Sequence, residues 1–324
     1  MRVLVTGAAG FIGSHLTEAL LASGANVRAL AQYNSRNDWG FLADAVEKKA
    51  PGLEVVTGDV RDAHHMAAVC KGVDAVYHLA ALIPIPYSYA APMSFAATNV
   101  LGTLHTLEAA RAAGVKKFIQ VSTSEVYGTA RQVPMSESHP LQAQSPYAAS
   151  KIGADQTALS YWHSFKLPVN VIRPFNTFGP RQSARAVIPT ILVGLLSGKK
   201  ELRLGDTRPV RDFTFVADTV RGLIAGAKAA PGQVVHLGTG RGVSIGEVAR
   251  LCAQACGLPP PRIVTESQRR RPAASEVMRL ISNNGQARRA LKWSPKTSLE
   301  EGLRLTADYI RGHLDQYKAD IYNI

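Results

Sequence analysis

Residues 2–13 read RVLVTGAAGFIG. The apolar run at their start predicts a buried strand over residues 2–6, and the glycines after it predict a turn into a helix that reaches about Ser23. The three glycines permit a tight turn, a close backbone approach to a pyrophosphate, and close packing of helix on strand. The amides and partial positive charge of the helix N-terminus suit phosphate groups. We therefore expect a dinucleotide-binding site formed by Gly7, Gly10, Phe11, Ile12 and Gly13.

Beyond this stretch, apolar strand-like runs and helical segments alternate along the first half of the chain. Such alternation predicts the α/β class with a parallel, doubly wound sheet. The expected strands cover residues 26–30, 53–57, 75–79, 117–121 and 169–173, and long helices cover about 94–113 and 146–165. Two prolines stiffen LIPIPYSY at residues 82–89, which we expect to be a loop that faces the substrate.

The ends of the second, third and fourth strands are candidates for further cofactor contacts. The second strand runs into LAQYNSR at 30–36 and lacks the acidic residue that binds the ribose 2′-hydroxyl in NAD enzymes. NAD and NADP therefore both remain candidates, with Arg28 or Arg36 near a 2′-phosphate. We expect Asp59 to meet the adenine, whereas Asp62 fits the role of a helix cap. The candidates in the third and fourth segments are Asp59, Val60, Leu79, Ala80 and Ala81.

A candidate reaction centre lies between Val121 and Lys151. Tyr147 and Lys151 are one helical turn apart, so the phenol and the ammonium share one face of the helix. A lysine beside a phenol favours the phenolate, which would lower the pKa of Tyr147 and suit it to acid–base work on an alcohol. The alternative is an ordinary exposed pair on a helix. Upstream, Ser122, Thr123, Ser124 and Glu125 follow a strand at the edge where open α/β sheets bind ligands.

The 324 residues carry 46% hydrophobic and 19% charged residues, as expected of a globular enzyme. The formal net charge of +13 comes from scattered basic residues without an interleaved aromatic stripe, so we expect no nucleic-acid partner. The densest cluster, at residues 269–271, suits a small polyanionic substrate instead. Three cysteines make neither a disulfide framework nor a metal site. With no signal peptide or membrane span in the sequence, we expect a cytoplasmic protein.

Six motifs occur in one order across residues 6–182: TGAAGFIG, HLAA, TNVLGT, STSEVYG, YAASK and RPFNTFGPRQ. This set resembles the extended short-chain dehydrogenase/reductase family that acts on nucleotide sugars. The resemblance implies an NAD(P)-binding Rossmann domain over residues 1–173, to which a later strand near 211–237 returns, and a smaller, mainly C-terminal α/β substrate domain over 174–324. It also implies a homodimer, and it places Thr123, Tyr147 and Lys151 at the reacting sugar and nicotinamide. Asn99 would support the lysine, and Pro174 would lie beside the cofactor.

The same resemblance implies contacts to a nucleotide-sugar substrate from the second half of the chain. Arginine side chains suit phosphate oxygens because their donors form a planar fork. For Arg211 the alternative is a structural salt bridge to Asp212, and we expect Asp218 to cap the helix that follows it. The predicted substrate-binding residues are Ser88, Asn176, Arg181, Arg211 and Arg271.

Glu125 indicates which reaction follows the oxidation of the sugar that the family shares. After oxidation of the sugar at carbon 4, a carboxylate two residues beyond Thr123 can remove the proton on carbon 5, and water then leaves from carbon 6. Glu125 could instead cap a turn or pair with a cation. In many related dehydratases an aspartate protonates the leaving hydroxyl, whereas this chain has Ser124, so the proton donor is either Ser124 or Glu125. We therefore expect a nucleotide-sugar 4,6-dehydratase.

Three alternatives remain. UDP-glucuronate decarboxylases also carry Ser-Thr-Ser-Glu-Val-Tyr-Gly, but the basic-proline element that they share is replaced here by Leu280-Ile281-Ser282-Asn283. A nucleotide-sugar 4-epimerase needs no base at Glu125, and a non-catalytic dinucleotide sensor on the same fold would typically lack the tyrosine–lysine pair. YNSRNDWG at 33–40, ALIPIPYSY at 81–89 and RQSARAVIPTI at 181–191 resemble the dehydratases that act on GDP-N-acetylglucosamine in legionaminic acid synthesis.

Overall fold

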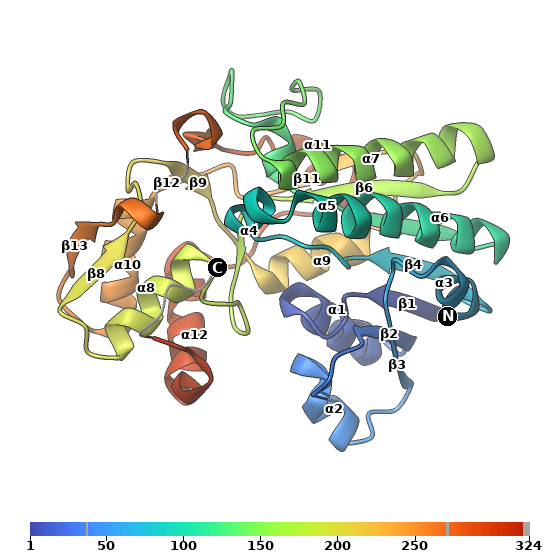
Figure 1. Cartoon of the computed structure of the whole chain (residues 1–324), viewed down its shortest axis with the longest axis horizontal. Helices are drawn as coiled ribbons and strands as arrows, with labels where there is room; N and C mark the ends of the chain where they lie inside the picture. The colour runs from blue at the N-terminus through green and yellow to red at the C-terminus, as the bar shows by residue number, and fades with distance from the viewer. Residues whose placement is uncertain (37, 270–271, 320–324) are drawn as a thin grey trace.

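The computed structural model describes residues 1–36, 38–269 and 272–319. A seven-stranded parallel sheet forms its largest part, with the strand order β11-β6-β5-β4-β1-β2-β3 (Figure 1). The order in which the strands are added to the sheet reverses between β1 and β4. Folds of this kind bind ligands in the crevice at that point. The sheet strands are β1 (Arg2–Thr6), β2 (Asn26–Gln32), β3 (Leu53–Gly58), β4 (Ala75–His78), β5 (Lys117–Val121), β6 (Val169–Pro174) and β11 (Val234–Leu237).

Helices cover both faces of this sheet, which confirms the predicted doubly wound α/β fold (Figure 1). The helices α3, α6 and α7 pack together over one face, and α1 and α9 pack together over the other. Their bounds are α1 (Phe11–Ala22), α2 (Ala43–Glu47), α3 (Ala63–Cys70), α5 (Pro92–Phe95), α6 (Gly102–Ala112), α7 (Pro146–Phe165), α9 (Val216–Gly226) and α11 (Gly285–Leu291). A π-helical turn, Ala96–Leu101, joins α5 to α6 without a break.

A second, smaller group of elements lies beyond the carboxyl edge of the sheet (Figure 1). In it, α8 and α12 both pack against α10, and β8 pairs in parallel with β13. Shorter strands connect this group to the sheet. The elements are β7 (Thr177–Phe178), α8 (Val187–Leu196), β8 (Glu201–Leu204), β9 (Val210–Asp212), β10 (Thr214–Phe215), β12 (Gly242–Ser244), α10 (Ile245–Cys256), β13 (Arg262–Thr265), β14 (Arg279–Leu280) and α12 (Leu299–Gly312).

Two local expectations are wrong. Residues 85–90 form a short helix, α4 (Ile85–Ala90), because Pro84 precedes the helix and Pro86 lies in its first turn, where a missing amide costs nothing. Asp218 does not cap α9, whose N-cap is Phe215. Its carboxylate instead accepts the backbone amides of Lys296 and Thr297, and so fastens a distant loop to α9.

The described part of the chain contains no helix that is both long and apolar enough to cross a membrane. As expected, Asp62 caps α3 by accepting a hydrogen bond from the His65 amide. Cys252 is buried on α10, and Cys256, one turn further on, is partly buried there.

Candidate functional site

The glycine turn between β1 and α1 leaves no room for side chains. Gly7 has a φ of +68°, and a Cβ there would lie 2.9 Å from the amide nitrogen of Ala80. A Cβ at Gly13 would lie 2.1 Å from the carbonyl oxygen of Gly7. Gly10 is the N-cap of α1, so the first amides of this helix, at Phe11 and Ile12, are not covered by a capping side chain. A diphosphate fits this arrangement, because it needs close backbone approach and free amide donors.

A buried hydrogen-bonded chain starts directly before this turn. The hydroxyl of Thr6 accepts the amides of Leu79 and Ala80, each at 3.1 Å, and lies 2.9 Å from Nδ1 of His78. On the other side of the ring, Nε2 lies 3.1 Å from the hydroxyl of Thr103. Burial lowers the pKa of His78 to about 3, so the ring is neutral at pH 7. The chain therefore fixes the segment after β4, where we predict cofactor contacts, to the glycine turn.

Asn99 continues this chain towards the reaction centre. The carbonyl oxygen of Asn99 accepts the Thr103 hydroxyl at 2.6 Å. Its carboxamide accepts the amide of Leu82 at 2.8 Å and donates to the Leu82 carbonyl at 2.9 Å and to the Ser150 hydroxyl at 2.9 Å. Asn99 lies in the π-helical turn, a feature that is common at functional sites. Its hydrogen bond to Ser150 ties it to the residue directly before Lys151.

The predicted catalytic residues come together at the end of β5. Tyr147 and Lys151 lie on α7 and are only 7% and 4% exposed, so they are not an exposed surface pair. Thr123 is the N-cap of the short 3₁₀ helix Ser124–Tyr127, and its hydroxyl accepts the amide of Glu125 at 3.2 Å. The Thr123 side chain also hydrogen-bonds Tyr147, and the charge of Glu125 acts on the same phenol. The Thr123 hydroxyl and the Glu125 charge therefore both act on the Tyr147 phenol.

The expected lowering of the Tyr147 pKa by Lys151 is not what the structure shows. Burial raises the pKa of Tyr147, the hydrogen bond from Thr123 lowers it, and the charge of Glu125 raises it. The Lys151 ammonium donates instead to the carbonyl of Val121 at 2.7 Å. Desolvation of the buried phenol therefore has the largest effect on the Tyr147 pKa, and the one-turn spacing from Lys151 does not lower it as predicted.

The other predicted cofactor residues lie at the ends of β3 and β6, whereas Arg28 lies near the start of β2. Asp59 forms a bidentate pair with Arg61, which holds the pKa of the Asp59 carboxyl below its usual range. Val60 is buried against α6. Arg28, one candidate for a 2′-phosphate, pairs with Glu54 at 3.0 Å and donates to two backbone carbonyls, so its side chain is already engaged. Pro174 is the last residue of β6 and is buried.

The predicted substrate residues have varied surroundings. Ser88 is buried in α4 and donates to the carbonyl of Ile85, and the Asn176 side chain donates to the Asp212 carbonyl at 3.3 Å. Arg181 pairs with Glu18 of α1 at 2.7 Å. Arg211 is buried and pairs with Glu276 at 3.3 Å, not with Asp212, whose carboxylate accepts hydrogen bonds from two other loops. Arg271 lies outside the described residues.

Several residues that the sequence did not single out adjoin the site. The Asp155 carboxylate, one turn beyond Lys151 on α7, is fully buried and pairs with Arg173 of β6 at 3.0 Å. It also accepts the hydroxyl of Ser122 at 2.7 Å. Among the residues that the sequence did single out, Ser124 is buried. The spacing of Tyr147, Lys151 and Asp155 by four residues was the signal that would have found the aspartate.

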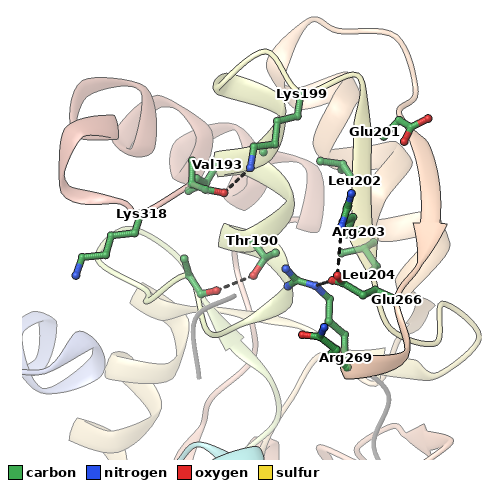
Figure 2. Close-up of a pocket in the computed structure, with 14 residues that line it drawn as sticks. Thr190, Val193, Lys199, Glu201, Leu202, Arg203, Leu204, Glu266, Arg269 and Lys318 are labelled. Atoms are coloured by element: carbon green, nitrogen blue, oxygen red, sulfur yellow. Dashed lines mark hydrogen bonds and ion pairs between the residues drawn. The ribbon is translucent and has the colours of Figure 1, made fainter. Parts of the chain in front are cut away.

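A pocket of about 520 Å³ lies in the smaller group of elements, between α8, β8 and the turn at residues 266–269 (Figure 2). Its charged lining includes Lys199, Arg203, Arg269 and Lys318, and Glu266 pairs with the two arginines. None of the predicted catalytic residues lines it. The candidate catalytic centre around Tyr147 is therefore separate from this pocket.

The sheet, the glycine turn and the tyrosine–lysine pair define an enzyme of the extended short-chain dehydrogenase/reductase class. Residues 4–306 match the family model described as GDP-mannose 4,6 dehydratase, and the chain belongs to this family.

Among curated proteins, the chain is 36% identical to a UDP-glucose 4-epimerase of Mycolicibacterium smegmatis, with 96% of this chain and 99% of that protein covered. It is 33% identical to a dTDP-glucose 4,6-dehydratase of an Actinoplanes species, with 97% and 98% covered. Among solved structures, it is similar to DesIV, a dTDP-glucose 4,6-dehydratase of Streptomyces venezuelae with NAD bound, at 34% identity and a TM-score of 0.89, with 98% and 99% covered. MoeE5 in complex with UDP-glucose and NAD has 33% identity and a TM-score of 0.85, with 97% and 100% covered.

Proposed function

We propose that this protein is a nucleotide-sugar 4,6-dehydratase that recycles a bound NAD or NADP. The observation that carries the proposal is the position of Glu125 in the short helix after β5, where its amide donates to the Thr123 hydroxyl at 3.2 Å. The effect of the Glu125 charge on the Tyr147 pKa agrees with this position. An epimerase needs an acid–base group at the 4-hydroxyl, but it does not need a second base beside it. A dehydratase needs both, because it must also remove the proton on carbon 5.

The roles of the residues follow from this arrangement. Tyr147 takes the proton of the sugar 4-hydroxyl, and Thr123 holds that hydroxyl and the phenol in line. A bound nicotinamide would accept the hydride from carbon 4 and return it at carbon 6. Glu125 removes the proton on carbon 5, which the 4-ketone has made acidic, and water leaves from carbon 6. We assign the protonation of the leaving hydroxyl to Glu125, because this residue then carries the proton taken from carbon 5, whereas a serine hydroxyl is a weak acid.

For the cofactor, the NAD bound in DesIV and MoeE5 supports NAD, and the glycine turn suits its diphosphate. The end of β2 keeps NADP in consideration, because Gln32 is exposed there in place of an acidic residue. Denaturing freshly purified protein should release one of the two dinucleotides in near-stoichiometric amount. For the substrate we propose a GDP- or UDP-N-acetylhexosamine, which rests on the resemblance of residues 33–40, 81–89 and 181–191.

The product mass tests the proposal against its rivals. The protein is incubated separately with GDP-N-acetylglucosamine, UDP-N-acetylglucosamine, GDP-mannose, dTDP-glucose and UDP-glucuronate. Dehydration loses water, decarboxylation loses carbon dioxide, and epimerisation leaves the mass unchanged. We expect loss of water from an N-acetylhexosamine nucleotide and, in deuterated water, entry of deuterium at carbon 5. Glu125→Gln should retain the fold and bound cofactor but slow dehydration by a factor on the order of 10².

A second candidate function is 4-epimerisation, favoured by the 36% identity to the mycobacterial UDP-glucose 4-epimerase. An isomer of unchanged mass, formed equally well by Glu125→Gln, would establish it and overturn the dehydratase proposal. Carbon dioxide from UDP-glucuronate alone would establish a decarboxylase. Against that outcome, Ser282 in the segment at 280–283 donates to the Asp212 carboxylate, a structural role.

A further inference from the structure

The buried carboxylate of Asp155 lies on the same face of α7 as Tyr147 and Lys151. The three residues are spaced by four, so each lies one turn from the next. All three are buried, and Asp155 is completely inaccessible to solvent. A charged group in such a place is costly unless it is paired, so its surroundings indicate what it does.

Three consecutive residues at the end of β5 each hold one of these side chains. The carbonyl of the first accepts the ammonium at 2.7 Å, the hydroxyl of the second donates to the carboxylate at 2.7 Å, and the hydroxyl of the third hydrogen-bonds the phenol. The pairs are Val121–Lys151, Ser122–Asp155 and Thr123–Tyr147. These contacts fix the position of α7 along β5, the strand that leads into the proposed substrate contacts.

The two oxygens of the Asp155 carboxylate have different partners. Oδ2 accepts both the Ser122 hydroxyl and the Arg173 guanidinium, whose Nε lies at 3.0 Å. Oδ1 is buried without a hydrogen-bond partner in the described structure. Arg173 in turn donates to the Tyr127 hydroxyl at 2.6 Å, so the arginine is held from both sides. Burial raises the pKa of the Asp155 carboxyl, and the attractions of Arg173 and Lys151 oppose that rise.

The charged and titratable groups around Lys151 come from four elements. On α7 these are Tyr147 and Asp155. From β4, His78 is neutral at pH 7 because of its burial, and the Lys151 charge lowers its pKa further. From β6, Arg173 is paired with Asp155. From the turn after β5, the Glu125 charge acts on Tyr147.

Burial lowers the pKa of Lys151, and the attraction of Asp155 raises it. Asp155 is therefore the group that opposes loss of the Lys151 charge in this buried site.

We propose that Asp155 is a positioning residue for the reaction, whose carboxylate keeps the Lys151 ammonium charged and in place beside Tyr147. A purely structural Asp155 would also hold Arg173, but it would not set the protonation of Lys151. The inference rests on the proposed function for its kinetic consequence only, because the protonation of Lys151 can be measured without turnover.

The test is a pH titration of the Lys151 amine by NMR in protein labelled with ¹⁵N at its lysine side chains, with Lys151→Arg used to assign the signal. Asp155→Asn keeps the shape of the side chain and removes its charge. We expect the midpoint of the Lys151 titration to fall by about one pH unit or more, the usual effect of a nearby opposite charge. Asp155→Glu should restore most of this shift. Ser122→Ala, which removes a hydrogen bond and leaves the carboxylate, should leave the midpoint within a few tenths of a unit.

The kinetic readout is the alkaline limb of kcat against pH. Activity that needs the ammonium is lost as the pH rises through the pKa of Lys151, so Asp155→Asn should move this limb to lower pH by the same amount. If Asp155→Asn does not fold, the double variant Asp155→Asn with Arg173→Met removes both charges of the buried pair. A smaller fall of the Lys151 midpoint is expected there, because loss of the Arg173 cation opposes it. An unchanged midpoint in Asp155→Asn, or a higher midpoint in the double variant, overturns the proposal. Absence of any turnover with an altered midpoint would overturn the proposed reaction and leave the role of Asp155 intact.

Discussion

Tyr147 is the residue whose protonation limits the proposed chemistry. Burial raises its pKa, and the hydrogen bond from Thr123 is the interaction that lowers it. At any pH below this pKa, the fraction of phenolate falls about tenfold for each unit by which the pKa rises. A change that raises the pKa of Tyr147 therefore lowers a rate that needs the phenolate.

Thr123→Val removes that hydrogen bond and retains the size of the side chain. We expect kcat/KM at pH 7 to fall by about three- to tenfold, because a hydrogen bond of about 1 kcal/mol changes the pKa by about 0.5–1 pH unit. Steady-state kinetics at this fixed pH measure the fall. Ser124→Ala is the matched control, since it alters the adjacent hydroxyl and leaves Tyr147 and Thr123 unchanged. An unchanged kcat/KM in Thr123→Val would show that Thr123 does not influence the phenol.

At the scale of elements, patterns that depend on neighbours in sequence were predictable. The glycine turn was found because a positive φ at Gly7 and the contact of Gly13 with the turn both require glycine. The helix Pro146–Phe165 was predicted with its observed bounds. The helix α4 was missed because prolines that stiffen a loop also suit the first turn of a helix, and composition does not separate the two.

Interactions between distant segments were not predictable in this way. Asp155 meets Arg173, 18 residues further on, only because α7 packs beside β6. Likewise, Asp218 was expected to cap its own helix but accepts amides 78 and 79 residues away. An aspartate near a helix start fits both roles, and only the tertiary fold decides which one it has.

Asn99 links three elements, and its loss should loosen all of them. Its carboxamide bonds both backbone groups of Leu82 and the hydroxyl of Ser150, and the side chain is 1% exposed. Asn99→Ala leaves these groups without their partner, so we expect the free energy of unfolding to fall by about 1–3 kcal/mol. Urea denaturation measures it.

The matched control is Asn34→Ala. Asn34 makes a similar number of hydrogen bonds within its loop, but it is exposed, so water can replace them. We expect a change within about 0.5 kcal/mol there. Equal losses in both variants would mean that the Asn99 contacts carry no special weight in the fold.

At the scale of the whole molecule, the large sheet holds the glycine turn and the predicted catalytic residues at one edge, and the smaller group of elements lies beyond that edge (Figure 1). The hydrogen-bonded chain runs from Thr6 on β1 through His78 on β4 to Thr103 on α6 and Asn99 in the π-helical turn. The predicted cofactor contacts therefore come from the sheet and the turns at its edge. The predicted substrate residues Arg181 and Arg211 lie outside the sheet, between β7 and α8 and on β9.

The outer surface of α6 and α7 is the place where we propose that two copies of the chain associate. The two helices pack side by side on one face of the sheet (Figure 1). Large apolar side chains are exposed at their ends, with Leu101 49% and Phe165 53% exposed. Leu101 lies directly before α6, and Phe165 ends α7. Helices packed face to face across a two-fold axis would bury both side chains.

Leu101→Asp should weaken such a dimer, because burying an unpaired carboxylate in an apolar interface is costly. Light scattering at micromolar concentration should show a dimer for the parent chain and a larger monomer fraction for the variant. Leu258→Asp is the control, since Leu258 is similarly exposed at 40% but lies just after α10, in the smaller group of elements. That variant should remain dimeric. A parent chain that is monomeric at these concentrations, or equal dissociation of the two variants, would contradict association through α6 and α7.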